Sequence, residues 1–138
     1  MKKRLNCLFP VLILLLLFAA LVSCGGSKVG VRPDEKYEMD EPVPKGAGDA
    51  KTVNLTFTPE TIVPNQLMLK AGEKVLFVIK NTDPKEDHNF LEPDAGLEEI
   101  LVHPGQTVRR LWTAPSKAGE YVPSCNIHPW ISMTLVVQ

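Results

Sequence analysis

The residues best suited to chemistry lie near the end of the chain, in the stretch PSCNIHPWISM. It places His128 three residues after Cys125, and Met133 five residues after His128. A thiolate, an imidazole and a thioether are ligands of transition metals, so the pattern Cys-x₂-His-x₄-Met favours a metal site. The alternative is a buried structural cysteine beside a surface histidine and a methionine that fills space in the core.

A fourth ligand has to come from elsewhere, and the chain has only three histidines. His88 closes the stretch NTDPKEDHNF and opens a predicted strand, whereas His103 lies in the predicted turn VHPGQT and is expected to face solvent. Two histidines, one cysteine and a weak axial methionine are the ligands of a type 1, or blue, copper site. We therefore predict one copper ion held by His88, Cys125 and His128, with Met133 as the axial ligand.

The elements that must position these ligands read as strands. TVNLTF alternates apolar and polar residues, and AGEKVLFVIKNTD holds an apolar run between two turns. About eight short strands, with no convincing amphipathic helix, predict an all-β Greek-key sandwich or barrel over residues 51–138. If EYVPSC and MTLVVQ are neighbouring strands, the residues between them form a tight loop at one end of this domain.

The start of the chain indicates export. Three basic residues precede an apolar run from Leu8 to Val22, which is typical of a signal peptide and short for a membrane span. The ending LVSC resembles the lipoprotein box of bacteria, in which the cysteine is lipidated and cleavage occurs just before it. This resemblance implies a lipoprotein signal peptide over residues 1–23 and lipidation of Cys24. Residues 24–50 are rich in Gly and Pro and are expected to form a flexible tether to a bilayer, on the periplasmic or outer face of the cell envelope.

Charge and cysteine content narrow the possibilities further. Residues 1–23 carry three of the 15 basic side chains and none of the 16 acidic ones, so 12 basic side chains remain in the mature chain. The mature chain thus has 16 acidic side chains against 12 basic ones, and this excess of negative charge argues against nucleic acid as a partner. Cys7 leaves with the signal and Cys24 is lipidated, so Cys125 remains alone in an oxidising compartment. A bound metal would mask that thiol.

From about Thr52 to its end, the sequence resembles the cupredoxins of the plastocyanin and azurin kind. The resemblance rests on the strand AGEKVLFVIKN, on His88-Asn89, on the HPGQT turn, and on Gly119-x-Tyr121 leading into the Cys-x₂-His-x₄-Met loop. It implies that the Asn89 side chain ties the two ligand loops together. It also implies a monomeric electron carrier that is not an enzyme, with His128 as the electron exit. Pro129 and Trp130 would form the docking face for a redox partner such as a cytochrome or a membrane oxidoreductase.

The sequence departs from the family beside the first histidine, and several alternatives stay open. Asp87 stands where relatives usually have Pro or Gly, and a carboxylate beside the metal would lower the reduction potential. A related alternative is a red copper site, in which Asp87 or Glu86 displaces Met133. Another is a protein that delivers or stores copper. Seven acidic residues between Asp83 and Glu99 predict steering of a basic partner. A Cys–His hydrolase is disfavoured, because a tight loop leaves no substrate cleft.

Overall fold

The computed structural model describes residues 36–138, so the expected signal peptide and Cys24 lie outside the described residues. In this part of the chain the regular elements are nine strands and one short 3₁₀ helix. The all-β prediction is therefore confirmed, and the two-residue strand β2 accounts for the difference from about eight. The elements are β1 (Lys51–Phe57), β2 (Ile62–Val63), β3 (Gln66–Leu69), β4 (Lys74–Asn81), β5 (His88–Glu92), η1 (Pro93–Ala95), β6 (Leu97–Val102), β7 (Thr107–Thr113), β8 (Gly119–Tyr121) and β9 (Thr134–Val137).

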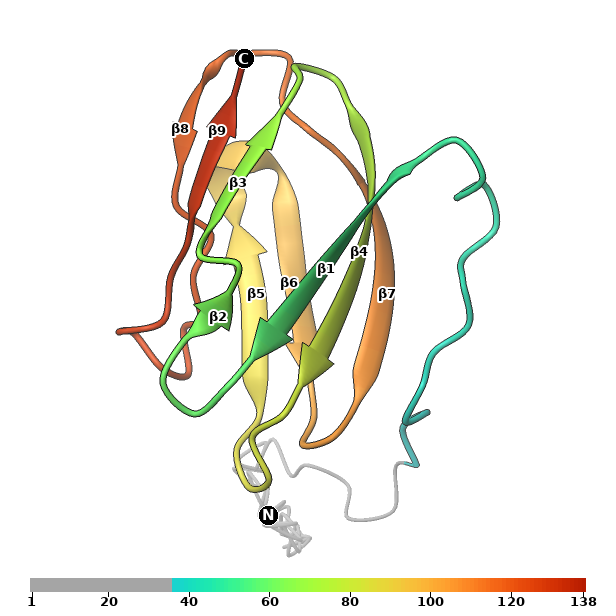
Figure 1. Ribbon diagram of the computed structural model, residues 1–138, viewed down its shortest axis with the longest axis vertical. Helices are drawn as coiled ribbons and strands as arrows, with labels where there is room; N and C mark the ends of the chain where they lie inside the picture. The colour runs from blue at the N-terminus through green and yellow to red at the C-terminus, as the bar shows by residue number, and fades with distance from the viewer. Residues whose placement is uncertain (1–35) are drawn as a thin grey trace, which may run out of the picture. The chain divides into compact units, whose positions relative to one another are not determined.

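The strands form two larger sheets and a hairpin (Figure 1). One sheet has the order β2-β1-β4-β7, the other has the order β3-β9-β8, and β5 pairs with β6 alone. The pairs β1–β4 and β3–β9 are parallel, and the remaining pairs are antiparallel. Parallel neighbours cannot be joined by a tight hairpin, so the chain crosses between the sheets as in a Greek key.

The core lies between these layers, and the strand patterns explain why. β1 buries alternate residues, whereas β4 is buried along most of its length because it lies inside its sheet between β1 and β7. Phe77 of β4 contacts Phe90 of β5 edge to face, with ring centroids 5.5 Å apart, and packs against Trp112 of β7 at the same distance. The largest fully buried side chains include Phe57, Phe77 and Phe90. Aromatic contacts of this kind connect the hairpin to the four-stranded sheet.

Residues 36–50, which the sequence assigned to the tether, run beside β7 in the structure. The backbone N–H of Thr107 donates to the carbonyl oxygen of Met39 at 2.8 Å, and that of Glu41 donates to the carbonyl oxygen of Thr107 at 3.0 Å. Arg109 is ion-paired with Asp40, and Arg110 with Glu41. These bonds cover part of the outer edge of β7, which would otherwise present unpaired backbone groups.

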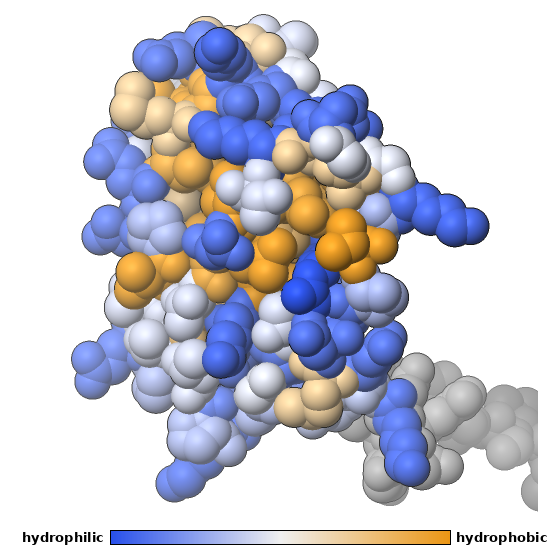
Figure 2. All heavy atoms as spheres, turned by 45° about the vertical axis from the view of Figure 1, so that its right-hand side comes forward, coloured by the Kyte–Doolittle hydropathy of each residue, from blue (hydrophilic) through white to orange (hydrophobic). Residues whose placement is uncertain are grey.

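The surface carries both apolar and hydrophilic side chains (Figure 2). Figure 2 shows apolar side chains gathered at mid-height on one face and hydrophilic side chains around them. At the end of the molecule that holds the loop before β9, Ile127 is 44% exposed and Trp130 is 67% exposed. Trp130 is thus a surface residue and does not pack in the core. Among residues 36–138 the structure contains no helix with the length and apolar character needed to span a membrane.

Candidate metal centre

Two loops at one end of the domain bring the predicted ligands together. His88 is the first residue of β5, as predicted, and the residues from Cys125 to Met133 connect the antiparallel neighbours β8 and β9. Ser124 joins the second loop to β5, because its N–H donates to the carbonyl oxygen of Leu91 at 3.1 Å and its own carbonyl oxygen accepts from Leu91 at 3.3 Å. The tight loop between neighbouring strands is therefore confirmed.

Backbone hydrogen bonds fold this loop back on itself. The N–H of Cys125 donates to the carbonyl oxygen of Ile131 at 3.0 Å, and the N–H of Ile131 donates to that of His128 at 2.9 Å. Pro123 lies beyond the end of β8, where its missing N–H interrupts no strand ladder, and its carbonyl oxygen accepts from Met133 at 2.9 Å. These bonds hold the cysteine and the following histidine on the same side of the loop.

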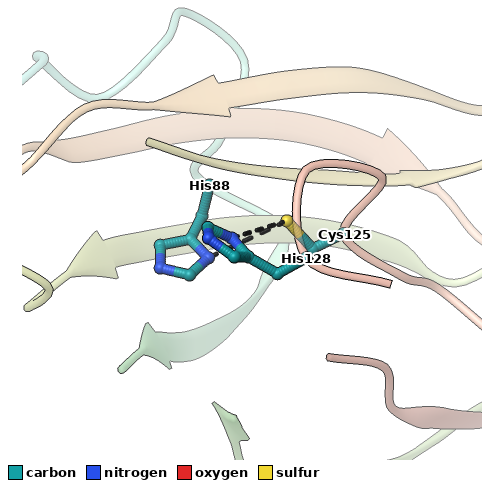
Figure 3. Close-up of side chains that lie close together, drawn as sticks. All are labelled: His88, Cys125 and His128. Carbon is teal, nitrogen blue, oxygen red and sulfur yellow. Dashed lines mark hydrogen bonds between the residues drawn. The ribbon is translucent and has the colours of Figure 1, made fainter. Parts of the chain in front are cut away.

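The side chains of His88, Cys125 and His128 converge in a compact cluster (Figure 3). The Nδ1 atoms of His88 and His128 lie 3.8 and 3.7 Å from the Sγ atom of Cys125. The ligand atoms of all three residues lie within 4.8 Å of one another. His88 is 0% exposed and Cys125 is 1% exposed, whereas His128 is half-buried. Three borderline or soft ligand atoms thus face one small volume, closed on the His88 side and open toward His128.

The surroundings of His88 keep its imidazole neutral. The ring stacks on Phe57, with centroids 4.8 Å apart, and its other neighbours include the His128 ring at 4.5 Å. Burial, reinforced by the nearby His128, lowers the pKa of His88 below its ordinary value. A neutral imidazole offers one nitrogen lone pair, which is the form that binds a metal.

Asn89 joins the two ligand loops, at the position where the family resemblance implied a clamp. Its backbone N–H points to the Sγ atom of Cys125 at 3.5 Å, and its side-chain Oδ1 accepts from the N–H of Asn126 at 2.7 Å. The remaining side-chain N–H group donates to Oε1 of Glu99, on β6, at 2.6 Å. The Glu99 carboxylate therefore fixes which way the Asn89 amide points. Sequence reasoning missed Glu99, because the pairing of β5 with β6 that brings it to Asn89 cannot be read from the sequence.

Asp83 is a second residue that sequence reasoning missed. Its Oδ1 atom accepts the N–H groups of Lys85 and Glu86 at 2.9 and 3.1 Å, and the side-chain oxygen of Asn81 accepts its own N–H at 2.8 Å. These bonds, first that from Lys85, lower the pKa of the Asp83 carboxyl, which is therefore ionised at neutral pH. The Oδ2 atom lies 3.6 Å from Nε2 of His88. The motif Asn-x-Asp is the signal that could have pointed to this turn.

The remaining predicted site residues lie around the cluster. Asp87 points to His103, with Oδ1 2.9 Å from Nδ1, and the one possible metal-ligand group found in residues 36–138 includes neither Asp87 nor Glu86. His103 is thus partly buried and paired rather than simply solvent-facing. Met133 is 3% exposed, and its role as axial ligand stays a prediction. Trp130 meets the His128 ring edge to face, with centroids 5.1 Å apart, and Pro129 between them is exposed.

An all-β sandwich with a His-Cys-His cluster at one end is the architecture of the cupredoxins, and comparison with known families agrees with this assignment. The cupredoxin-like domain family matches residues 12–137. The chain therefore belongs to the cupredoxin-like family. No match was found among curated proteins.

Solved structures share the fold at low sequence identity. Auracyanin A of Chloroflexus aurantiacus, a blue copper protein, has a TM-score of 0.55 and 20% identity, over 64% of this chain and 99% of that chain. Auracyanin of Roseiflexus castenholzii has a TM-score of 0.54 and 17% identity, over 66% and 99%. The metal-binding domain of the Streptococcus pneumoniae D39 Cu(I)-exporting P-type ATPase CopA has a TM-score of 0.55 and 12% identity, over 72% and 94%. At these identities the likeness shows the fold alone.

The hydrogen bond between Asn89 and Asn126 gives a testable prediction about the loop. Asn89→Ala removes the acceptor for the Asn126 N–H, and a hydrogen bond of this kind contributes about 0.5–1.5 kcal/mol to stability. We expect the free energy of unfolding in denaturant to fall by that amount. The Asn126 amide should also exchange with solvent faster in the variant than in the unaltered protein, while the amides of β1 keep their rates. Asn54→Ala, at an exposed position of β1, is the control, and an equal loss in both variants would contradict the clamp.

Proposed function

We propose that this chain is a type 1 copper protein, tethered to a membrane, that carries single electrons between redox partners. We also propose that it is not an enzyme. The observation that carries the proposal is the convergence of His88, Cys125 and His128 within 4.8 Å, at the end of a cupredoxin-like sandwich. Copper bound there supplies a one-electron couple between Cu(II) and Cu(I).

The donor set fits copper on chemical grounds. Imidazole nitrogen suits Cu(II), thiolate sulfur suits Cu(I), and two histidines with one cysteine make up the trigonal part of a blue-copper site. The Sγ atom of Cys125 also accepts the Asn89 N–H at 3.5 Å, which fixes the sulfur beside the two histidines. His88, Cys125 and His128 would hold the ion, and Met133 would supply the weak axial sulfur. Because the loops are held by hydrogen bonds, these ligands need to move little when the charge of the site changes.

Exposure distinguishes the two histidines and suggests an exit for the electron. His88 is sealed behind Phe57, whereas His128 is half-buried and contacts the exposed Trp130. We therefore propose that His128 faces the partner and that Pro129 and Trp130 form part of the docking surface. The exposed Trp130, together with the acidic β4–β5 loop that leads into His88, suits a redox protein with an apolar contact and a basic rim, such as a cytochrome or a membrane oxidoreductase.

Copper titration tests the proposal directly. Residues 36–138, added to Cu(II) in steps, should develop an intense visible absorption that saturates at one equivalent, because the Cys125 sulfur transfers charge to copper. Cys125→Ser should abolish the colour, whereas Met68→Ala, at a site exposed by 53%, should leave it unchanged. A colourless Cu(II) complex of the unaltered protein would refute the type 1 site. Electron paramagnetic resonance of the same sample would distinguish the red alternative, in which Asp87 or Glu86 replaces Met133.

Copper delivery is a second candidate, favoured by one observation. A structure that shares this fold is the metal-binding domain of a Cu(I)-exporting ATPase, solved with Cu(I). A carrier of electrons should exchange them rapidly with a soluble cytochrome while retaining copper. We expect electron exchange in stopped-flow mixing and no loss of copper to an apo acceptor on that timescale. Rapid transfer of Cu(I) to the acceptor, without electron exchange, would favour delivery instead.

We also propose that the exported chain is anchored through a lipid on Cys24, at the start of the segment 24–50 that the sequence predicts as a tether. The support is the sequence LVSC after a basic and apolar leader. Cys24→Ala in the full chain, expressed in a bacterium, should move the protein from the membrane fraction to the soluble fraction, because two or more acyl chains are lost. Retention of the variant in membranes at the level of the unaltered protein would contradict the anchor.

A further inference from the structure

The second ring nitrogen of His88 faces a buried carboxylate. Nδ1 points to Cys125, so Nε2 points away from the cluster, where Oδ2 of Asp83 lies 3.6 Å away. Nε2 is buried and has no hydrogen-bond partner in the structure, and Asp83 is itself 5% exposed. At 3.6 Å the pair is an electrostatic contact rather than a hydrogen bond. The contact still favours a proton on Nε2, because a carboxylate attracts an N–H group and repels a lone pair.

A neutral imidazole carries its proton on one nitrogen only, and that choice decides which nitrogen can bind a metal. A proton on Nε2 leaves the Nδ1 lone pair directed at the Cys125 sulfur and at His128. A proton on Nδ1 would fill that position instead. The N–H bond and the nitrogen lone pair both lie in the plane of the ring, so a group stacked on its face, such as the apolar ring of Phe57, does not favour either nitrogen. On the Nε2 side Asp83 is the group placed to attract the proton, and on the Nδ1 side its counterpart is the Cys125 sulfur.

We propose that Asp83 is a positioning residue that holds the His88 proton on Nε2 and so keeps Nδ1 free for copper. The inference rests on the proposed function for its purpose, but the proton position is a property of the metal-free protein. Asp83 suits this role because it is itself fixed. One of its oxygens accepts two backbone N–H groups, which leaves the other oxygen, an acceptor only, directed at the ring.

The fixed orientation makes Asp83→Asn a sharp test. The side-chain oxygen of the asparagine is needed to accept the N–H groups of Lys85 and Glu86, so its NH₂ group must occupy the position of Oδ2. A donor then faces Nε2 and favours a lone pair there, which moves the proton to Nδ1. The substitution keeps the shape of the turn but replaces the acceptor that faces Nε2 with a donor.

The experiment is nitrogen-15 NMR of the imidazole rings in copper-free protein of the full domain, residues 36–138. In the unaltered protein we expect Nε2 of His88 to carry the proton. In Asp83→Asn we expect the Nε2 signal to shift to the range of an unprotonated nitrogen, and copper affinity in a chelator competition to fall about 10–100-fold. Asp94→Asn, which removes one exposed carboxylate from η1, is the control and should leave the His88 signals unchanged.

Several results would overturn the inference. One is a proton on Nδ1 of His88 in the unaltered protein, which needs no variant to be stable. Another is a proton that stays on Nε2 in folded Asp83→Asn, or that moves equally in Asp94→Asn. The failure of the proposed function would look different, because the ring would show the expected proton while Cu(II) gave no intense colour.

Discussion

The metal end of this domain depends on the two hydrogen bonds by which Asn89 holds the loop of Cys125. One is made by its backbone N–H to the sulfur, and the other by its side chain to the Asn126 N–H. Asn89 and Cys125 are 36 positions apart in the chain, so nothing local keeps them together. His88 adjoins Asn89, so the bonds that hold the cysteine loop also set the distance between the first histidine and the sulfur. The β-sandwich surrounds the ligands, and the hydrogen bonds of Asn89 set the distances between them.

The same end of the domain collects the buried polar side chains. Among residues 36–138 they belong to the end of β4, the start of β5, the loop between them, and the turn before β7: Asn81, Asp83, His88, Asn89 and Gln106. Burying polar groups is costly unless each finds a partner, and each of the five makes at least one contact of hydrogen-bond type through its side chain. Among these five residues, the buried side-chain atom without a hydrogen-bond partner is Nε2 of His88. The apolar core thus gives stability, while the polar end trades some stability for fixed ligand positions.

The sequence predicted the strands and the ligand cluster because both leave local or compositional marks. Alternation marks β1, a long apolar run marks β4, and three histidines leave few ways to complete a set around Cys125. The positions of Asp83 and Glu99 leave no comparable mark. Each is one acid among seven in the same stretch, and only the turn at Asn81 and the pairing of β5 with β6 single them out.

Residues 36–50 show the same limit in another way. Their glycines, prolines and charges predict a flexible tether, but Asp40 and Glu41 find Arg109 and Arg110 on β7. Backbone hydrogen bonds to the edge of a strand need no apolar pattern, so composition alone cannot foresee them.

The arrangement of the cluster also bears on the choice between carrying electrons and delivering copper. Delivery requires that an acceptor reach the ligands in turn, which favours a mobile and exposed set. Here His88 and Cys125 are buried, and hydrogen bonds that involve β5 and β6, together with those inside the Cys125 loop, hold the loops around them. Only His128 has a path to the surface, beside the exposed Trp130. An electron could leave through the half-buried His128 ring, but a copper ion would have to break its bonds to two buried ligands. The geometry therefore favours the carrier, because it opens the site to a partner at one ligand while keeping the other two out of reach.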